Sequence, residues 1–269
     1  MFKDITIGQY VDGNSAIHKM DARVKILLSI VYIIILFVIH SPNAYLLFGV
    51  FTVCVVLISK VPLRYILKGL KPLMYILVFT AIINLFMTGG DTVLWQSGMW
   101  SALKITKEGA KSAVQMVLRL VFLVMGTSLL TLTTTPLMLT DGIEKLLKPF
   151  DAIKVPSHEI AMMMTIAIRF IPTLSEETDK IMKAQMARGA DFESGNIFRR
   201  TKAMVPILVP LFISAFKRAD DLAIAMDSRC YNSGNKRTRM KTMKMTKIDA
   251  VAAVIMVLFC ALVIVIQKF

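Results

Sequence analysis

Two arginines in this chain stand in matching surroundings, and their chemistry is that of binding a carboxylate. Arg188 lies in KAQMARGADFESG (183–195) and Arg229 in IAMDSRCYNSG (224–234), each after an apolar, helix-compatible stretch and before polar residues that end on Ser-Gly. A guanidinium presents five donors in a rigid fork that matches a carboxylate bidentately. Small neighbouring residues leave each fork uncovered, so we expect both arginines to dock at acidic grooves on another protein.

The same two arginines also fit a simpler interpretation, in which each only ends a helix. The helix dipole favours an arginine in the last turn by about 0.3–1 kcal/mol. Gly189 can take the left-handed conformation that closes helices, whereas Cys230 cannot do so as cheaply. We therefore expect the second helix to end differently from the first, at Gly234.

Other chemistry-bearing patterns do not occur in the sequence. There is no G-x-x-x-x-G-K-[ST], no H-E-x-x-H, no G-x-S-x-G and no G-x-G-x-x-G. The three cysteines and the three histidines have no spacing typical of a disulfide framework or a zinc site. The sequence predicts neither an enzyme nor a chain that binds a cofactor or a metal ion.

The composition of the chain indicates the environment of the helices that position the two arginines. Of the 269 residues 56% are hydrophobic and 19% charged, the net charge is +14, and the mean hydropathy is +0.65. Such a chain is either a membrane protein with basic cytoplasmic loops or a nucleic-acid binder with an unusually apolar core. Long apolar runs favour the membrane, and we expect no nucleic-acid partner.

The apolar runs predict an all-α membrane protein with about five transmembrane helices plus long cytoplasmic or interfacial helices. A span needs about 20 mostly apolar residues. The runs that qualify or nearly do are 24–40, 43–59, 72–88, 112–134 and 248–267. We therefore divide the chain into a membrane domain with four spans (1–134), a cytoplasmic domain (135–247) and a last span (248–269).

The distribution of lysine and arginine predicts the orientation of these spans. Residues 1–25 and the loop 60–71 are basic, and 135–247 carries 19 of the 32 basic residues. Three lysines in the loop 89–111 count against this assignment. The N-terminus is predicted to be cytoplasmic and the C-terminus external. Arg119, inside the fourth span, is expected to reach the membrane interface, and the basic tail 235–247 is expected to contact anionic lipid.

The segment 135–247 contains two shorter apolar runs, 160–174 and 203–216, each followed by a polar-faced helical stretch. We expect two long helices, partly buried near the membrane, whose far ends extend into the cytoplasm. A transmembrane hairpin formed by the two runs is the alternative topology. Thr173 and Glu176 form a capping box directly after Pro172, which predicts that a helix or a new helical leg begins there.

Three stretches of the chain resemble the transmembrane coupling subunit, or T component, of energy-coupling factor (ECF) transporters: LTLTTTPLMLTDGIEKLLKPF, IAIRFIPTLSEETDKIMKAQMARGADF and AIAMDSRCY. The resemblance is strongest over about 131–231. Its most specific part is RFIP, with Arg169 and Pro172, followed by Ala-Arg-Gly. The family's pattern has Ala-Arg-Gly twice. The first copy is complete here, and the second keeps only its arginine; the matching residues are Ala187, Arg188, Gly189, Ser228, Arg229 and Cys230.

The resemblance implies a non-catalytic coupling subunit of an ATP-driven importer in a bacterial cell membrane. Such a subunit holds two ABC-type ATPases through arginine-tipped coupling helices, which Arg169 and Pro172 would support. It also binds a small membrane protein that captures a vitamin or a metal ion, and ATP is used by the partner subunits. The alternatives are a self-sufficient secondary transporter or channel, and a membrane anchor that recruits cytoplasmic protein without transport.

Overall fold

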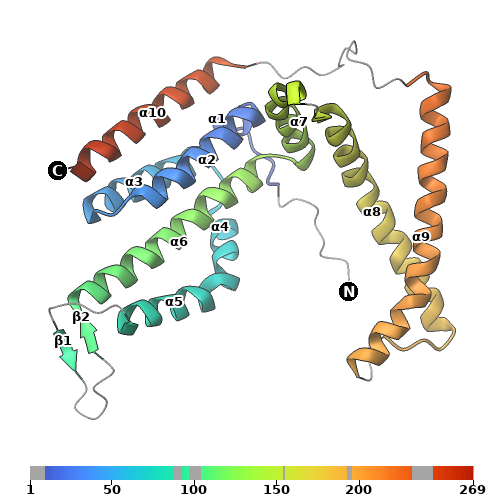
Figure 1. The fold of residues 1–269 in the computed structure, drawn as a ribbon, viewed down its shortest axis with the longest axis horizontal. Coiled ribbons are helices and arrows are strands. Elements are labelled where there is room, and N and C mark those ends of the chain that lie inside the picture. Colours follow the sequence, from blue (N-terminus) through green and yellow to red (C-terminus); the bar gives the residue numbers. More distant parts are fainter. Residues whose placement is uncertain are drawn as a thin grey trace. The chain divides into compact units, whose positions relative to one another are not determined.

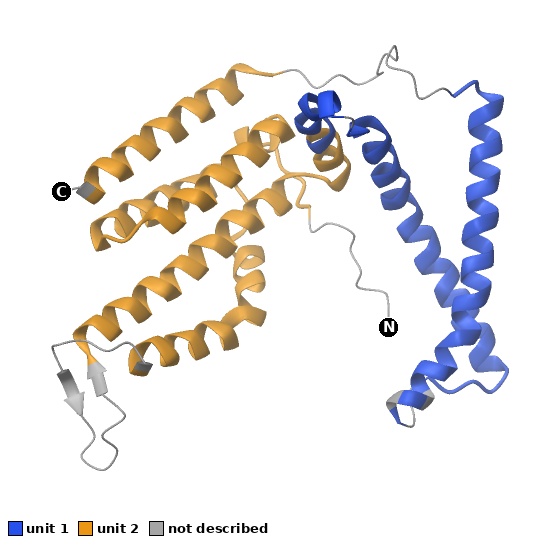
Figure 2. Cartoon of the chain, in the orientation of Figure 1, with its two compact units in different colours: residues 1–7, 143–242 blue, residues 8–142, 243–269 orange. Residues whose placement is uncertain are grey.

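The structure is a computed structural model that describes residues 10–87, 93–96, 104–153, 155–192, 196–231 and 245–268 (Figure 1). These residues form two compact units, which Figure 2 distinguishes by colour. The bundle unit contains the described residues up to 142 together with 245–268, and the long-helix unit contains those from 143 to 231.

The bundle unit is almost entirely helical. Its one exception among the described residues is an antiparallel pair of short strands, β1 with β2. The elements are α1 (Ala16–Lys19), α2 (Ala22–Val38), α3 (Pro42–Ser59), α4 (Leu63–Leu70), a 3-10 turn (Lys71–Leu73), α5 (Met74–Met87), β1 (Val93–Gln96), β2 (Lys104–Thr106), α6 (Lys107–Thr133), the first part of α7 (Pro136–Leu147) and α10 (Lys247–Lys268).

The core of the bundle unit lies where α2, α3, α6 and α10 meet. Leu36 and Phe48 are fully buried there. The ring of Phe48 lies 5.6 Å from that of Phe122 on α6, and Phe51 stacks on Phe259 of α10 at 3.9 Å. Ring pairs of this kind add about 0.5–1.5 kcal/mol each to the burial of their apolar surface. The last helix is therefore packed against the first helices of the chain.

All five predicted spans are helices in the structure. Among the described residues, the helical stretches long and apolar enough to cross a membrane are Pro42–Ser59, Leu63–Phe86, Lys107–Thr133 and Lys247–Gln267. The predicted span 24–40 corresponds to α2, whose 17 residues place it at the short end of the range for a transmembrane helix. The fold class, an all-α membrane protein, is confirmed.

Two of the loops predicted between the membrane spans differ from the structure. The basic segment 60–71 was expected to be a loop, but it contains α4 and continues through a 3-10 turn into α5. Pro72 lies in this turn, where its fixed φ suits a helical start. The loop expected at 89–111 includes the strands β1 and β2, and α6 begins earlier than 112 because Thr106 caps it, its side chain accepting from the amide of Gly109 at 3.0 Å.

The long-helix unit contains the end of α7, a 3-10 segment (Lys148–Ile153), α8 (Ser157–Ala187) and α9 (Ile197–Ser228). The two predicted long helices are present, and each contains one of the shorter apolar runs. Neither belongs to the four stretches suited to crossing a membrane, so the alternative of a transmembrane hairpin gains no support from length and composition.

The expectation of a helix start at Thr173 is wrong, because α8 runs through Pro172 without a break. A proline inside a helix removes one amide donor and crowds the carbonyl of the preceding turn. A helix of 31 residues has long regular stretches on both sides of that defect. The apolar and polar faces of α8 continue across Pro172, and this continuity outweighs the local capping-box pattern.

Candidate docking site at two helix ends

Arg188 lies at the C-terminal end of α8, where the chain closes in a compact cap. The Arg188 amide donates to the Gln185 carbonyl at 3.1 Å and the Gly189 amide donates to that of Met186 at 2.9 Å. The amide of Ala190 returns to the Gln185 carbonyl at 3.0 Å. Gly189 has a φ of +88°, the left-handed conformation that glycine takes most readily.

The C-terminal end of α9 repeats this cap with the same spacing. The Arg229 amide donates to the Met226 carbonyl at 3.1 Å and the Cys230 amide donates to that of Asp227 at 2.9 Å. The amide of Tyr231 returns to the Met226 carbonyl at 2.9 Å. Cys230, at the position of the glycine, has a φ of +53°. The two helices therefore end in equivalent backbone geometry.

The expected difference between the two helix ends is accordingly wrong. The helix ends at Ser228 and Cys230 closes it, while Gly234 lies outside the described residues. A left-handed conformation costs a residue with a Cβ about 1–2 kcal/mol. The three hydrogen bonds of the cap satisfy carbonyls that would otherwise lack partners, and this gain outweighs the cost.

The side chains at both ends face solvent. All six predicted docking residues, Ala187 to Gly189 and Ser228 to Cys230, are exposed. Within the described part of the chain, neither guanidinium forms a hydrogen bond or an ion pair. A Cβ built on Gly189 would meet nothing within 4 Å. Each helix end thus presents an unpaired fork with open space around it.

The structure does not bring the two arginines together. Figure 1 shows the C-terminal ends of α8 and α9 at opposite ends of the crossed helix pair. Arg169 and Pro172 are exposed in the middle of α8. At 1.5 Å per residue, Arg169 lies about 28 Å along the helix from Arg188. The candidate site thus consists of two separate helix ends, one at Arg188 and one at Arg229, which we call the arginine tips. The supporting role of Arg169 and Pro172 stays a prediction.

A polar contact holds α8 and α9 where they pack against each other. Arg218 Nη2 donates to Glu177 Oε2 at 2.8 Å, and the Ser214 hydroxyl donates to Glu177 Oε1 at 2.5 Å. The Ser214 hydroxyl, together with the Arg218 guanidinium, holds the pKa of the Glu177 carboxyl below its usual value. This contact was not predicted from the sequence, although the spacing of four residues between Ser214 and Arg218 was a usable signal.

The opposite side of α9 is apolar and exposed. Ile207 lies on the buried side and is 7% exposed, whereas Phe216 is 69% exposed. The other large apolar residues exposed on this stretch of α9 are Met204, Val205, Leu208, Val209, Phe212 and Ile213. A contiguous apolar surface of this kind marks a site of contact with another protein or with lipid.

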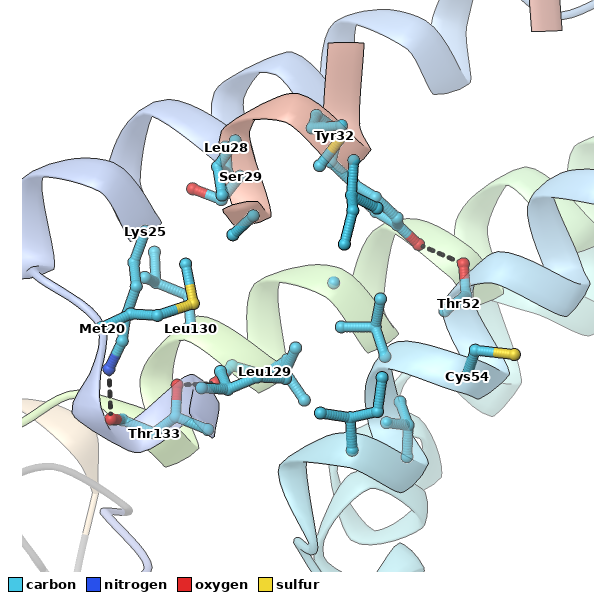
Figure 3. A pocket seen from close by; sticks show the side chains of 18 of the residues that line it. Met20, Lys25, Leu28, Ser29, Tyr32, Thr52, Cys54, Leu129, Leu130 and Thr133 are labelled. Atoms are coloured by element: carbon cyan, nitrogen blue, oxygen red, sulfur yellow. Dashed lines mark hydrogen bonds between the residues drawn. The ribbon is translucent and has the colours of Figure 1, made fainter. Parts of the chain in front are cut away.

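The bundle unit contains a cavity of about 400 Å³ between α1, α2, α3, α6 and α10 (Figure 3). Its lining is apolar apart from a few side chains at its margins. Lys25 Nζ donates to the Thr133 carbonyl at 2.9 Å, and Tyr32 shares a hydrogen bond of 3.0 Å with Thr52. The polar groups there are bonded to protein, so the cavity offers space for an apolar group and no catalytic arrangement.

Arg119, which was expected to reach the membrane interface, joins α6 to the turn between two of the predicted spans. It lies near the middle of α6. Its Nη2 donates to the carbonyl of Ile39 at 3.0 Å, and its Nε donates to the Tyr45 hydroxyl at 3.0 Å. Ile39 is the C-cap of α2. The guanidinium therefore satisfies a helix-terminal carbonyl and ties α6 to the α2–α3 turn.

Fold and site together describe a helical membrane protein with two exposed arginine-tipped helices. Over residues 13–242 the chain matches the family described as cobalt transport protein (CbiQ). A protein of Clostridium kluyveri is 59% identical, covering 98% of this chain and 96% of that protein. A protein of Thermosediminibacter oceani is 57% identical, covering 93% of this chain and 93% of that protein. A protein of Bacillus subtilis is 45% identical, covering 97% of this chain and 98% of that protein.

Each of these relatives is named energy-coupling factor transporter transmembrane protein EcfT. The chain belongs to this family, and the resemblance seen in its sequence is confirmed. It is a membrane subunit of an ECF transporter and works within a complex of several subunits.

Proposed function

We propose that the chain transmits motion from two ABC-type ATPases to a small substrate-binding membrane subunit, with the arginine tips of α8 and α9 as the two ATPase contacts. The chain itself binds no cofactor in this proposal, and ATP is bound and used by the ATPases. The imported substrate, a vitamin or a metal ion, is recognised by the substrate-binding subunit.

The observation that carries the proposal is the equivalence of the two tips. Two helices of the same unit end in the same cap, and each presents an exposed arginine without a partner among the described residues. Two identical or similar ATPases need two similar contacts, and a bidentate guanidinium–carboxylate pair supplies a strong and directional one. Losing one partner of such a buried interfacial pair costs about 2–5 kcal/mol.

The apolar side of α9 supports the proposed contact with the substrate-binding subunit. Phe212 and Phe216 are exposed on the side away from Glu177 and Arg218. A membrane-embedded partner offers an apolar surface of its own, so this side suits the substrate-binding subunit. The Glu177–Arg218 contact would then pass a displacement of either tip to that surface.

Contacts inside the bundle unit support the proposed orientation, with the N-terminus in the cytoplasm. The Lys25–Thr133 hydrogen bond places the start of α2 beside the end of α6. Ile66 of α4 packs against Val56 near the end of α3 and against Leu132. The described basic residues up to Lys25 and the basic segment 60–71 thus lie at one end of the unit, which fits the excess of positive charge in cytoplasmic segments of membrane proteins.

Co-purification with the ATPases tests the proposal. The full chain is expressed with its ATPase and substrate-binding subunits, extracted in mild detergent, and compared with Arg188→Glu/Arg229→Glu. We expect the variant to insert in the membrane and to lose at least 30-fold in ATPase affinity, which corresponds to the low end of the expected cost. The control is Lys202→Glu/Lys217→Glu, with the same change of charge at exposed positions of α9.

The outcomes separate the candidate functions. If the arginine variant retains the ATPases as well as the control does, the tips do not dock. If the wild-type chain purifies alone and transports substrate in vesicles without ATP, the function is that of a secondary transporter. Transport that depends on ATP and is lost only in the arginine variant is the expected result.

A further inference from the structure

The helix α4 carries a row of positive charge on one side. Lys60 precedes it, Arg64 and Lys68 lie within it, and Lys71 follows it, so the spacing is four, four and three residues. At about 100° per residue, Arg64, Lys68 and Lys71 fall within one narrow sector of the helix surface, and Lys60, the C-cap of α3, precedes them. All four residues are exposed. We call this row the α4 basic face.

No acidic residue lies near this face in the sequence. The stretch from Pro42 to Met87, which covers α3, α4 and α5, contains neither aspartate nor glutamate. Within the described residues none of the four cations has an ion-pair partner. Surface charge is usually of mixed sign, so a row of four unpaired cations points to an anionic ligand.

The remaining side of α4 fixes the direction in which the basic face points. Ile66 is 1% exposed and packs against Val56 and Leu132. A Cβ built on Gly69 would lie 3.3 Å from the Ser128 hydroxyl of α6, so the helix approaches α6 closely there. Ile66 is two residues, about 200°, from both Arg64 and Lys68. The basic face is therefore directed away from the bundle unit.

Exposed apolar side chains flank the basic face. Leu63 and Leu67 are 54% and 61% exposed, and Tyr65 is 46% exposed. Leucines beside a row of cations, on a short helix that follows α3 and continues into α5, form the pattern of a helix that begins at the boundary between headgroups and acyl chains. An acidic protein surface would explain the charges but not the exposed leucines.

We propose that the α4 basic face binds the phosphates of anionic phospholipid headgroups, with Leu63 and Leu67 inserted at the acyl boundary. Each cation at a membrane surface strengthens the attraction to anionic lipid about fivefold. The four together hold the bend between α3 and α5 at the interface. This role goes beyond the coupling function, and its failure would leave the arginine tips untouched.

The test measures lipid selectivity around the full-length chain. The chain is reconstituted in phosphatidylcholine bilayers, and the association of spin-labelled phosphatidylglycerol is compared with that of spin-labelled phosphatidylcholine. Three proteins are compared: wild type; Lys60→Gln/Arg64→Gln/Lys68→Gln/Lys71→Gln; and a charge-preserving control, Lys60→Arg/Arg64→Lys/Lys68→Arg/Lys71→Arg. If the quadruple glutamine variant does not insert, Arg64→Gln/Lys68→Gln takes its place.

We expect wild type and the control to prefer phosphatidylglycerol at low salt and the glutamine variant to lose most of that preference. High salt should reduce the preference of wild type towards that of the variant, because headgroup attraction is screened. An unchanged preference in the glutamine variant overturns the proposal. Loss of a co-purifying protein without any change of lipid preference also overturns it, and assigns the basic face to protein docking.

Discussion

Gly189 and Cys230 occupy the same position in two helix caps of the same form. Each follows an exposed arginine, each donates its amide to the carbonyl three residues earlier, and each has a positive φ, +88° for the glycine and +53° for the cysteine. A conformation that only glycine adopts freely is thus imposed on a cysteine as well. The cap, and with it the direction of the arginine, is maintained in spite of that cost.

Exchanging the residues at these two positions should change the stability of the helix ends in opposite directions. Cys230→Gly removes about 1–2 kcal/mol of left-handed strain and adds about 0.5–1 kcal/mol of chain entropy, so the end of α9 should become more stable by up to about 1 kcal/mol. Gly189→Ala should destabilise the end of α8 by about 1 kcal/mol, with no steric clash to complicate the comparison.

Amide hydrogen exchange measures both effects. The amides of the last turn of α9 should exchange up to about fivefold more slowly in Cys230→Gly, and those of α8 about fivefold faster in Gly189→Ala. Cys230→Ala is the matched control, because it removes the thiol and keeps the strain. Equal exchange rates in the glycine and alanine variants of residue 230 would contradict the explanation by backbone strain.

The contact of Glu177 with Arg218 should make the pairing of α8 and α9 dependent on pH. Since the pKa of Glu177 is lowered in the folded chain, the charged carboxylate stabilises the pair fully above its ordinary pKa of 4.5. That contribution is lost as the pH falls through the lower, folded value. Arg218 is 40% exposed, so the pair is partly screened and we expect a coupling energy of about 0.5–1 kcal/mol.

A double-mutant cycle of Glu177→Gln and Arg218→Gln, read at pH 7 and again below pH 4, measures this coupling. Spin labels placed on α8 and α9 report the distance between the helices in each variant. The distance distribution should broaden in both single variants at pH 7 and in wild type at the lower pH. Ser214→Ala, which removes only the hydroxyl donor, should show a smaller effect. Distributions that do not change with pH would exclude a role for this carboxylate.

The sequence predicted those features that depend on residues close together in the chain. Apolar runs of suitable length located the five helices, and the two arginines with small neighbours located the helix ends. The cap at Cys230 was mispredicted because propensity ranks glycine first, whereas three local hydrogen bonds decided the conformation. The break at Pro172 was mispredicted because a capping box is only a local pattern.

The contacts that could not be predicted join residues distant in sequence. Glu177 meets Ser214 and Arg218 only because α8 and α9 cross, and Arg119 meets Ile39 only because α6 passes the α2–α3 turn. The segment that forms α4 was predicted to be a loop because its charges were used only to predict the orientation of the spans in the membrane. Their spacing of three and four residues was the unused signal for a helix.

The packing of α2 on α6 should depend on the glycine at position 126. A Cβ built there would overlap the ring of Tyr32. The Tyr32 hydroxyl donates to the carbonyl of Phe122 at 2.9 Å and bonds Thr52, so the ring cannot move aside without losing these bonds. Gly126→Ala should therefore destabilise the folded chain by about 1–3 kcal/mol. Thermal unfolding in detergent checks this, with Gly69→Ala, whose contact is a looser 3.3 Å, as the milder control.

Asp249 should contribute most to holding the last helix in place, because one buried carboxylate caps two helices. Its Oδ2 accepts from the amide of Thr246 at 2.7 Å at the start of α10, and its Oδ1 accepts from the amide of Asp21 at 2.8 Å, directly before α2. The residue is 3% exposed, so loss of the carboxylate leaves the buried amide of Asp21 without this partner. Asp249→Ala should cost about 2–4 kcal/mol, the sum of a lost cap and an unsatisfied donor.

Cysteine crosslinking between α10 and α3, together with thermal unfolding in detergent, separates local from global loss. In Asp249→Ala the crosslink should form more slowly and the unfolding temperature should fall. Asp249→Asn should lie in between, since its oxygen can still accept one of the two amides. Asp220→Ala, an exposed carboxylate on α9, is the control for the loss of one negative charge. If α10 stays crosslinked at the wild-type rate in Asp249→Ala, aromatic packing through Phe51 and Phe259 holds it without the double cap.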